Sequence, residues 1–331
     1  MAIQSISIDN ITVFENLNLL FSNGINLFLG ENGTGKTHLM KFLYVATEMN
    51  RRDDDLKNRL YYRYFRSGKK TTSLVRNSVA GKEGKVSVRV NNEDVFLSVK
   101  STRENADDYY TLGNGDHHQS TGIFIPAKEM LSHSQGFLAL YDKYDMPFDK
   151  TLVDIVSNAQ LPETREISNE NKELLDELSN VIGGSVVMEN DTFFVAKEAG
   201  MKVDFSLEAE GIRKVGLLWK LIRNGLLEKG SMLFWDEPEA NLNPAAIPII
   251  VNVLLKLQEA GVQVFIATHN YILLKAFDLR KRTTNQVEFY SFFKLGDSVK
   301  VNQASELYLL QPNPILKAYE RLLDETIDSR I

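Results

Sequence analysis

The chain has 331 residues, a formal net charge of -6 at pH 7, 43% hydrophobic residues and 25% charged residues. This composition is ordinary for a globular protein of one elaborated domain or two. The net negative charge gives no indication that nucleic acid is a partner. The sequence contains no cysteine, which excludes disulfides and thiolate metal sites and favours a reducing compartment, so we expect a cytoplasmic protein.

The first 30 residues alternate apolar and polar side chains and are predicted to form strands. They open with neither a basic segment nor a continuous apolar run, so no secretory signal is expected. Ser22-Asn23-Gly24 separates two of the runs and predicts a hairpin turn between them. The second run, Ile25 to Leu29, leads directly into Gly30.

The stretch "GENGTGKT", residues 30–37, fits the phosphate-binding pattern G-x-x-x-x-G-K-[ST]. Apolar residues at helical spacing predict a helix from Lys36 to about Asn50, so the motif has the strand, loop and helix that it requires. Backbone amides and Lys36 would hold phosphates, and the Thr37 hydroxyl would face Mg²⁺. The nucleotide-binding residues expected here are Gly30, Glu31, Asn32, Gly33, Thr34, Gly35, Lys36 and Thr37.

The middle of the chain begins with its most basic segment, residues 51–76, in which nine basic and three acidic residues accompany four aromatic residues. Such a segment can contact nucleic-acid phosphates, or it can form the edge of a lobe whose tyrosines lie in the core. A hairpin turning near Asn91-Asn92 follows, then an apolar strand, "IFIP". From Lys128 to Ile182 the pattern is mainly helical.

The second half alternates predicted strands and helices. We expect a hairpin in "GGSVVMENDTFFVAKEAG", a helix from Gly211 to about Leu227, and strands in "MLFWDEP" and "VQVFIATHN". The most apolar window, residues 245–255, contains Pro248 and Asn252 and is shorter than the roughly 20 residues of a membrane span, so we expect no membrane contact. Two strands, "VEFYSFFKL" and "SVKV", precede a terminal helix, "PILKAYERLLDETID".

Two carboxylates end the apolar strand "MLFWDEP". Because Mg²⁺ bound to a nucleotide prefers oxygen ligands, Asp236 is the expected metal-site partner of Thr37. Glu237 is placed to orient or deprotonate an attacking water molecule. The next strand ends at Thr268-His269-Asn270, which brings a histidine toward the same edge of the sheet.

In this order, these features resemble the ABC-class ATPases, and more narrowly the RecF, SMC and overcoming-lysogenization-defect (OLD) proteins, from Ile3 to about Phe293. The resemblance implies an α/β fold, an ABC-type P-loop NTPase core with an antiparallel β lobe and a helical lobe. One domain would span residues 1–331, with 51–127 as β lobe and insertion, 128–182 as helical lobe and 183–331 as the remaining core.

The same resemblance implies ATP and Mg²⁺ as cofactors. Residues 30–37 would be the Walker A loop and "MLFWDEP" the Walker B strand, with Glu237 as the catalytic carboxylate. His269 would be the switch histidine that reads the γ-phosphate. Proteins of this class close two sites between head-to-tail subunits, so a homodimer or higher homo-oligomer is expected.

The signature motif of the class departs from its usual form. It would fall at "SLEAEGIRK", where Gly211 begins a helix and can contact an anion, but Ala209 stands where the class has serine. Ser206 could substitute from the preceding turn, or the contact could be made by backbone alone. Arg213 and Lys214 oppose the dipole at this helix start, which indicates either a phosphate of the partner subunit nearby or a solvated surface pair.

Two further positions also differ. Asn243, in the stretch "EANLNP" at the expected D-loop, stands where transporters carry an aspartate. No glutamine of a Q-loop is evident, and Lys128, Glu129 and Gln135 are the candidates for its place. These departures favour slow or conditional ATP hydrolysis.

Two functional hypotheses follow. The first is an ATPase whose ATP-closed dimer controls a separate effector protein, a nuclease or toxin, in antiphage defence or a toxin-antitoxin-like system. Only 62 residues follow His269, which leaves little room for the Toprim nuclease of longer OLD proteins, and Asp53 to Asp55 is a charge run and not a ligand set.

The second hypothesis is a DNA-binding clamp of the RecF or SMC type, which would use the basic segment 51–76. DNA binding that survives Arg63→Ala/Arg66→Ala/Lys69→Ala would refute that assignment. A coiled coil is excluded because no long heptad run exists. A transporter subunit or a small-molecule kinase explains fewer of the motifs.

Overall fold

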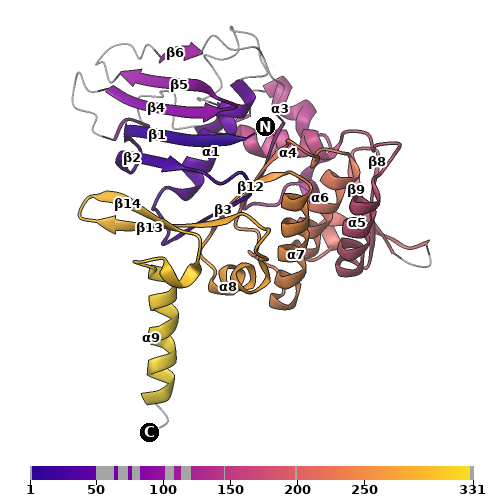
Figure 1. Cartoon of the computed structure of the whole chain (residues 1–331). Helices are drawn as coiled ribbons and strands as arrows, with labels where there is room; N and C mark the ends of the chain where they lie inside the picture. Colours follow the sequence, from indigo (N-terminus) through magenta and orange to yellow (C-terminus); the bar gives the residue numbers. More distant parts are fainter. Residues whose placement is uncertain are drawn as a thin grey trace.

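A computed structural model describes residues 2–49, 63–65, 74–76, 83–100, 108–112, 121–144, 146–197 and 200–328 of the chain. Figure 1 shows an antiparallel β layer, a central sheet, a group of helices beside that sheet and a helix that projects from the body. None of the described helices is long and apolar enough to cross a membrane.

The central sheet has six strands in the order β14-β13-β3-β12-β11-β7. Its strands are parallel except β14, which pairs antiparallel with β13. A parallel sheet covered on both faces requires continuous apolar runs, and "MLFWD" and "QVFIAT" are fully buried strands of this kind. The bounds are β3 Ile25–Gly30, β7 Gly122–Ile125, β11 Met232–Asp236, β12 Gln263–Thr268, β13 Val287–Leu295 and β14 Ser298–Ala304.

Helices cover one face of this sheet. Ile25, Leu27 and Leu29 of β3 point into a core that α4 to α8 complete. A three-stranded sheet, β10-β9-β8, joins the same core. The helices are α3 Phe137–Tyr144, α4 Lys150–Ala159, α5 Asn169–Ile182, α6 Glu210–Arg223, α7 Ile247–Glu259 and α8 Tyr271–Arg280, and the strands are β8 Gly184–Glu189, β9 Thr192–Lys197 and β10 Lys202–Asp204.

The opposite face packs against α1 and the antiparallel sheet β2-β1-β4-β5-β6. Phe28, Phe234 and Phe265 point to this side, and the last two stack with ring centroids 5.0 Å apart. The central sheet is therefore buried on both faces, which fixes the direction of each side chain at its edge. The elements are β1 Ile3–Ile11, β2 Phe14–Leu20, α1 Lys36–Met49, β4 Glu83–Val90, β5 Glu93–Lys100 and β6 Asp108–Leu112. The described residues also include the 3-10 helices η2 Leu131–His133, η4 Phe205–Leu207, η5 Pro244–Ala246 and η6 Leu307–Leu309.

The hairpin predicted at Ser22-Asn23-Gly24 is wrong. The hairpin lies earlier, between β1 and β2, and the segment after β2 carries the chain into the central sheet, where β3 pairs with β12 and β13. Asn26, fully buried on β3, accepts from the Ser22 amide and donates to the Ser22 carbonyl, which holds this crossing. β3 is buried on both faces between two parallel strands, and this tertiary packing outweighs the local turn signal.

The other elements predicted from the sequence are confirmed. The hairpins β4–β5 and β8–β9 turn at Asn91-Asn92 and Asn190-Asp191, all four with positive φ, as two-residue hairpin turns require. Helix α1, the helical region α3 to α5, helix α6 and the C-terminal strands and helix lie where their patterns place them. Residues 51–76 are described only at 63–65 and 74–76, so most of the basic segment lies outside the described residues.

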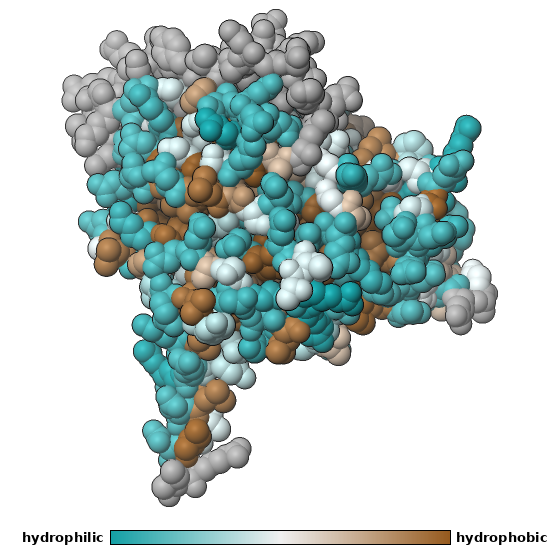
Figure 2. Space-filling model, viewed as in Figure 1, coloured by the Kyte–Doolittle hydropathy of each residue, from teal (hydrophilic) through white to brown (hydrophobic). Residues whose placement is uncertain are grey.

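Helix α9, Pro314–Asp328, projects from the body and has no buried residue (Figure 1). Tyr319 stacks on Tyr271 of α8 with ring centroids 4.7 Å apart, which fixes where the helix leaves the body. Beyond it, Leu322, Leu323 and Ile327 are exposed, and Figure 2 shows hydrophobic residues along this helix.

Candidate nucleotide site

The glycine loop lies between β3 and α1 and is packed against its neighbours. Gly30 abuts β13, because a Cβ there would lie 2.3 Å from the Phe292 carbonyl oxygen. Gly35 has φ +87°, and a Cβ there would lie 2.6 Å from both Phe14 and Val13 of the β1–β2 hairpin. The loop conformation therefore depends on glycine for its backbone angles and for its close approach to β1–β2.

Gly35→Ala is expected to destabilise the protein by about 2–4 kcal/mol, the sum of a left-handed alanine and an overpacked contact. Gly33→Ala is the matched control, because Gly33 also has positive φ (+76°) but a Cβ there meets nothing within 4 Å. It is expected to cost only about 1 kcal/mol. Urea unfolding of the two variants measures the difference, and equal losses would show that contact with Phe14 does not shape the loop.

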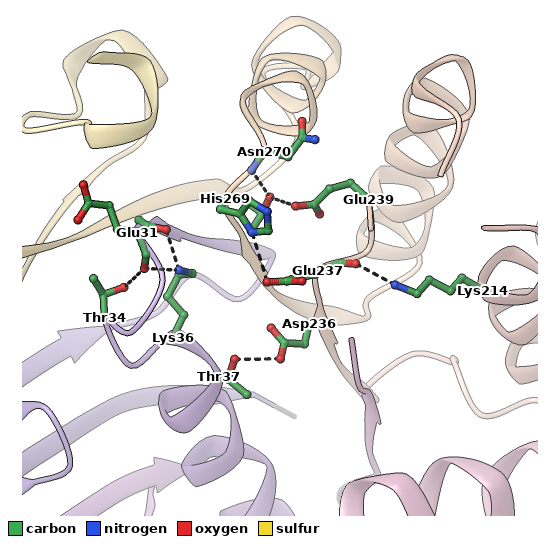
Figure 3. Close-up of polar contacts among 12 residues, drawn as sticks. Glu31, Thr34, Lys36, Thr37, Lys214, Asp236, Glu237, Glu239, His269 and Asn270 are labelled. Carbon is green, nitrogen blue, oxygen red and sulfur yellow. Dashed lines mark hydrogen bonds and ion pairs between the residues drawn. The ribbon is translucent and has the colours of Figure 1, made fainter. Parts of the chain in front are cut away.

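Lys36 is buried, and its amine lies inside the loop (Figure 3). Its Nζ donates to the carbonyl oxygens of Gly30 at 2.7 Å and Glu31 at 2.9 Å, and the Thr34 hydroxyl also donates to Glu31, at 2.8 Å. Burial lowers the pKa of Lys36, while nearby carboxylates, Asp236 first, oppose that shift. A buried cation in a glycine loop that leads into a helix N-terminus fits a polyphosphate.

Thr37 joins the loop to strand β11. Its hydroxyl donates to Asp236 Oδ2 at 2.9 Å, across 199 positions of sequence (Figure 3). Asp236 ends the fully buried strand β11, and its pKa is raised to about 6, mainly by burial and further by the charge of Glu237. The Thr37 hydroxyl, Lys41 and Lys36 act in the opposite direction. Hydroxyl and carboxylate oxygens thus meet at one point, as a Mg²⁺ site requires.

Glu237 and His269 lie beside this point at the ends of adjacent strands. His269 Nδ1 is 3.2 Å from Glu237 Oε1, and both side chains are partly exposed. The Glu237 backbone has φ +50°, a conformation that non-glycine residues rarely adopt. The partly exposed carboxylate is therefore held away from the buried core and toward the place where the loop would hold phosphates.

Thr268 and Asn270 fix the His269 backbone from both sides. The Thr268 hydroxyl donates to Glu239 Oε1 at 2.6 Å and accepts from the Asn270 amide at 2.9 Å (Figure 3). The Asn270 side chain caps α8 by accepting from the amides of Ile272 and Leu273. Glu239 is buried, and burial raises its pKa.

Ala209, Gly211 and Asn243, the remaining predicted nucleotide contacts, gather elsewhere. They line one pocket of about 520 Å³ between α6 and η5, which shares no residue with the loop 30–37. Ala209 is the N-cap residue of α6 and makes no capping bond with its side chain, while Asn243 caps η5 by accepting from the Ala245 amide. These residues therefore lie on a surface separate from the glycine loop.

The basic pair at the start of α6 makes contacts within its own chain. Arg213 lies 3.4 Å from Glu129 Oε2, and Lys214 is 1% exposed, with Nζ 3.5 Å from the Glu237 carbonyl oxygen. The solvated-pair interpretation made from the sequence is therefore wrong, whereas the contact with a phosphate of a partner subunit stays a prediction. The available signal was the helical spacing of Lys214 with Leu218 and Ile222, which places its side chain on the buried face of α6.

The Q-loop candidates follow β7. Glu129 is buried and accepts from the amides of Leu131 and Ser132 and from the Ser132 hydroxyl, so it organises η2 and holds Arg213. Lys128 and Gln135 are exposed. Glu129 therefore links the segment after β7 to α6.

A second cavity adjoins the loop at Gly33 and was not evident from the sequence. It has a volume of about 590 Å³ and lies between the β1–β2 turn and the β13–β14 hairpin. Arg76 crosses it by donating to the carbonyl oxygens of Val13 and Asp297. Its lining residues are Thr12, Val13, Gly33, Arg76, Lys294, Gly296, Asp297, Ser298 and Val299.

Two aromatic residues in the described part of the basic segment belong to the core. Tyr64 is fully buried and donates to Asp154 at 2.7 Å, and Phe65 stacks on Phe42 with ring centroids 4.5 Å apart. This agrees with the lobe-edge interpretation for these two positions.

Comparison with known families gives two matches. A family model described as "AAA domain" matches residues 5–182, which include the glycine loop. A second, described as "AAA domain, putative AbiEii toxin, Type IV TA system", matches residues 126–275, which include Asp236, Glu237 and His269. No curated protein matches the chain significantly.

Among solved structures, the chain is similar to Smc head domains. A head bound to the C-winged helix domain of ScpA aligns with TM-score 0.57 at 13% identity, over 93% of this chain and 99% of that one. A Pyrococcus furiosus head with an extended coiled coil, bound to the C-terminal domain of ScpA, gives 0.55 at 11% identity, over 98% and 99%. A Thermotoga maritima head gives 0.50 at 12%, over 92% and 99%. At these identities the likeness establishes the fold.

Proposed function

The chain belongs to the AAA-domain family of ATPases, in the ABC-class group of RecF- and SMC-like proteins, and from this premise we propose that it binds and slowly hydrolyses ATP with Mg²⁺ between two head-to-tail copies. The observation that carries the proposal is the contact between Thr37 and Asp236, because it brings the phosphate loop and the strand with the carboxylates into one site.

The residues of the site fit Mg²⁺ and ATP. The Thr37 hydroxyl and the Asp236 carboxylate would hold the metal ion, and Lys36 and the loop amides would hold phosphate oxygens. Bound Mg²⁺ supplies positive charge that shields the phosphates. Lys36 is already inside the loop, so it needs only to exchange carbonyl oxygens for phosphate oxygens. The cavity at Gly33 would take the nucleoside.

Glu237 would be the residue that acts on water. Its carboxylate is partly exposed, is 3.2 Å from His269 and lies next to Asp236, so it can accept a proton from water close to the metal site. His269, partly exposed on the adjacent strand, would donate toward the terminal phosphate and hold Glu237 in place.

The pocket between α6 and η5 supports a two-chain arrangement. The N-terminus of α6 offers free backbone amides beside Ala209 and Gly211, which favours an anion at that point. Because these residues lie in a pocket separate from the loop of their own chain, the phosphate that they contact would belong to a second copy. Asn243 would contribute from η5 on the same surface.

Ala209→Asp tests this contact through opposite effects on stability and activity. An aspartate at this N-cap is expected to stabilise the protein by about 1 kcal/mol, because it can accept from α6 amides that no side chain now caps. It is also expected to lower ATP turnover at least about tenfold, because its carboxylate would face the partner's phosphate. Thermal melts and ATPase assays measure the two effects.

Ala209→Ser is the matched control, because it caps the helix without adding charge. It should gain stability and keep turnover at the wild-type level or above. Wild-type turnover by the aspartate variant, over a range of protein concentrations, would show that α6 does not face a phosphate.

We further propose that the ATP-closed dimer controls a separate effector protein, a nuclease or toxin, in antiphage defence or a toxin-antitoxin-like system. The support is the family description that mentions a type IV toxin-antitoxin system. A switch of this kind also needs a surface outside its nucleotide site, and the apolar side of α9 lies outside that site.

A DNA clamp is the second candidate function, favoured by the Smc-head fold and the basic segment 51–76. Light scattering and ATP turnover with Mg²⁺ distinguish the two, first with ATP, then with ADP as control, then with duplex DNA. A mass increase with ATP alone supports the partner-controlling switch. A requirement for DNA in assembly or turnover would replace it by the clamp, and no ATP-dependent change of either kind would refute both.

A further inference from the structure

We propose that Lys214 is a positioning residue for ATP hydrolysis, which holds the Glu237 peptide from helix α6 and so links the partner-facing end of that helix to the catalytic carboxylate of its own chain. This inference rests on the proposed ATPase function. It assigns a role to a buried cation that contacts neither the loop 30–37 nor the predicted partner surface.

The first observation is the place of Lys214. Its side chain is 1% exposed, and its Nζ lies 3.5 Å from the Glu237 carbonyl oxygen (Figure 3). Burial lowers its pKa, and four carboxylates, Glu210, Glu239, Glu237 and Asp236, oppose that shift in decreasing order. An amine taken out of water is costly unless it finds partners. Glu210 lies one turn earlier on α6, whereas Glu239, Glu237 and Asp236 belong to the candidate site.

The second observation is the backbone that Lys214 contacts. Glu237 has φ +50° and precedes Pro238, and a residue before proline favours extended conformations. Such a conformation persists only when its surroundings hold it. The Glu237 amide donates to the Ala267 carbonyl at 2.9 Å. On the other side of the residue, the Glu237 carbonyl oxygen accepts from the Ala240 amide at 3.1 Å and from the Lys214 amine at 3.5 Å. Together they set the direction of the Glu237 side chain.

The third observation is the start of α6. Gly211 lies three positions before Lys214, on the same side of the helix, and packs so closely on the Asn241–Leu242 backbone that a Cβ would lie 2.5 Å from the Asn241 carbonyl oxygen. Gly211 also lines the pocket that would meet the second subunit. A small movement of α6 when the dimer closes would therefore be transmitted to Glu237 through one turn of the helix and the Lys214 side chain.

The test compares Lys214→Met with Lys220→Met in the full chain. Lys220 is also on α6 and 4% exposed, but its amine pairs with Glu163 at 2.8 Å, away from the site, so it controls for the loss of a buried amine. We expect Lys214→Met to bind ATP within about threefold of wild type and to lose about 30- to 100-fold in kcat, as for a misplaced catalytic group. Lys220→Met should keep its kcat, whatever its Tm.

A double-mutant cycle with Glu237→Gln separates positioning from general damage. If Lys214 acts through Glu237, Lys214→Met should add less than about twofold to the loss caused by Glu237→Gln alone. Single-turnover hydrolysis measures the slow rates. The proposal would be overturned if the double variant lost kcat by the product of the two single losses. A wild-type kcat for Lys214→Met, or an equal loss for Lys220→Met, would also overturn it.

Failure of the proposed role of Lys214 can be distinguished from failure of the proposed ATPase function. If Glu237→Gln hydrolyses ATP at the wild-type rate, the catalytic assignment itself is wrong. If Glu237→Gln is impaired but Lys214→Met is not, only the role of Lys214 is refuted. Should Lys214→Met fold poorly, Lys214→Arg keeps the charge and, when folded, is expected to stay within about tenfold of the wild-type kcat. A larger loss of kcat by a folded Lys214→Arg would contradict the proposal.

Discussion

Replacement of Glu237 by Gln is expected to lower the kcat for ATP hydrolysis by about 10²- to 10³-fold, the usual contribution of a positioned general base. Glutamine has the same shape and keeps an oxygen that faces His269, so the local structure should persist. ATP affinity should not change, because Lys36, Thr37 and Asp236 are untouched. The variant should therefore accumulate in its ATP-closed state, with a larger mass by light scattering than wild type under turnover.

Glu288→Gln is a suitable control for this variant. Glu288 is a partly buried carboxylate on β13, and burial raises its pKa, but it lies outside the candidate site. Its replacement should leave turnover unchanged. Rapid hydrolysis by Glu237→Gln would contradict the catalytic role of Glu237, whereas loss of ATP binding would show that the carboxylate acts in binding.

Asp236→Asn is expected to abolish Mg²⁺-dependent turnover and yet to stabilise the nucleotide-free protein. An amide cannot replace the negative charge that Mg²⁺ needs, so we expect turnover to fall by about 10³-fold or more. The stability gain follows from the pKa of Asp236, which rises from an ordinary 3.8 to about 6 in the folded protein.

The sign of the pH effect follows from this raised pKa. The contribution of Asp236 to stability is fully present below its ordinary pKa and is lost as the pH rises through the folded value. At pH 7.5 the ionised carboxylate therefore costs about 3 kcal/mol, which Asp236→Asn should recover in the free energy of unfolding. At pH 5 the recovered stability should be about half as large.

Urea unfolding at the two pH values, without nucleotide or Mg²⁺, measures this dependence. Asp142→Asn, at an exposed carboxylate of α3, should change neither stability nor turnover. If Asp236→Asn gained the same free energy of unfolding at both pH values, the gain would not arise from ionisation of Asp236. A destabilised variant would show that the bond from Thr37 outweighs the burial of charge.

Local patterns predicted the elements that carry the chemistry. β3, β11 and β12 are buried on both faces, so their residues are mainly apolar, and the glycine loop and the paired carboxylates follow at their ends. The meeting of Thr37 with Asp236, and of Glu237 with His269, follows because parallel strands end at one edge of a sheet.

The features that the sequence did not predict depend on which elements pack against one another in the tertiary structure. The turn residues Ser22 to Gly24 are compatible with a hairpin, but β3 finds two parallel neighbours and crosses to the other sheet. A lysine in the first turn of a helix opposes the helix dipole, which indicates an anion nearby. In the structure, the packing of α6 instead turns the Lys214 amine toward the Glu237 carbonyl. Both differences arise because local signals do not say which surface an element will meet.

The central claim, a site shared between two copies, is tested most directly by mixing two inactive variants. Glu237→Gln lacks the carboxylate but keeps α6, and Ala209→Asp has a blocked α6 but keeps the loop and the carboxylate. A mixed dimer contains one site in which both halves are intact, so a 1:1 mixture should recover up to about a quarter of the wild-type turnover. No recovery at any mixing ratio, with both variants folded and binding ATP, would contradict the shared site.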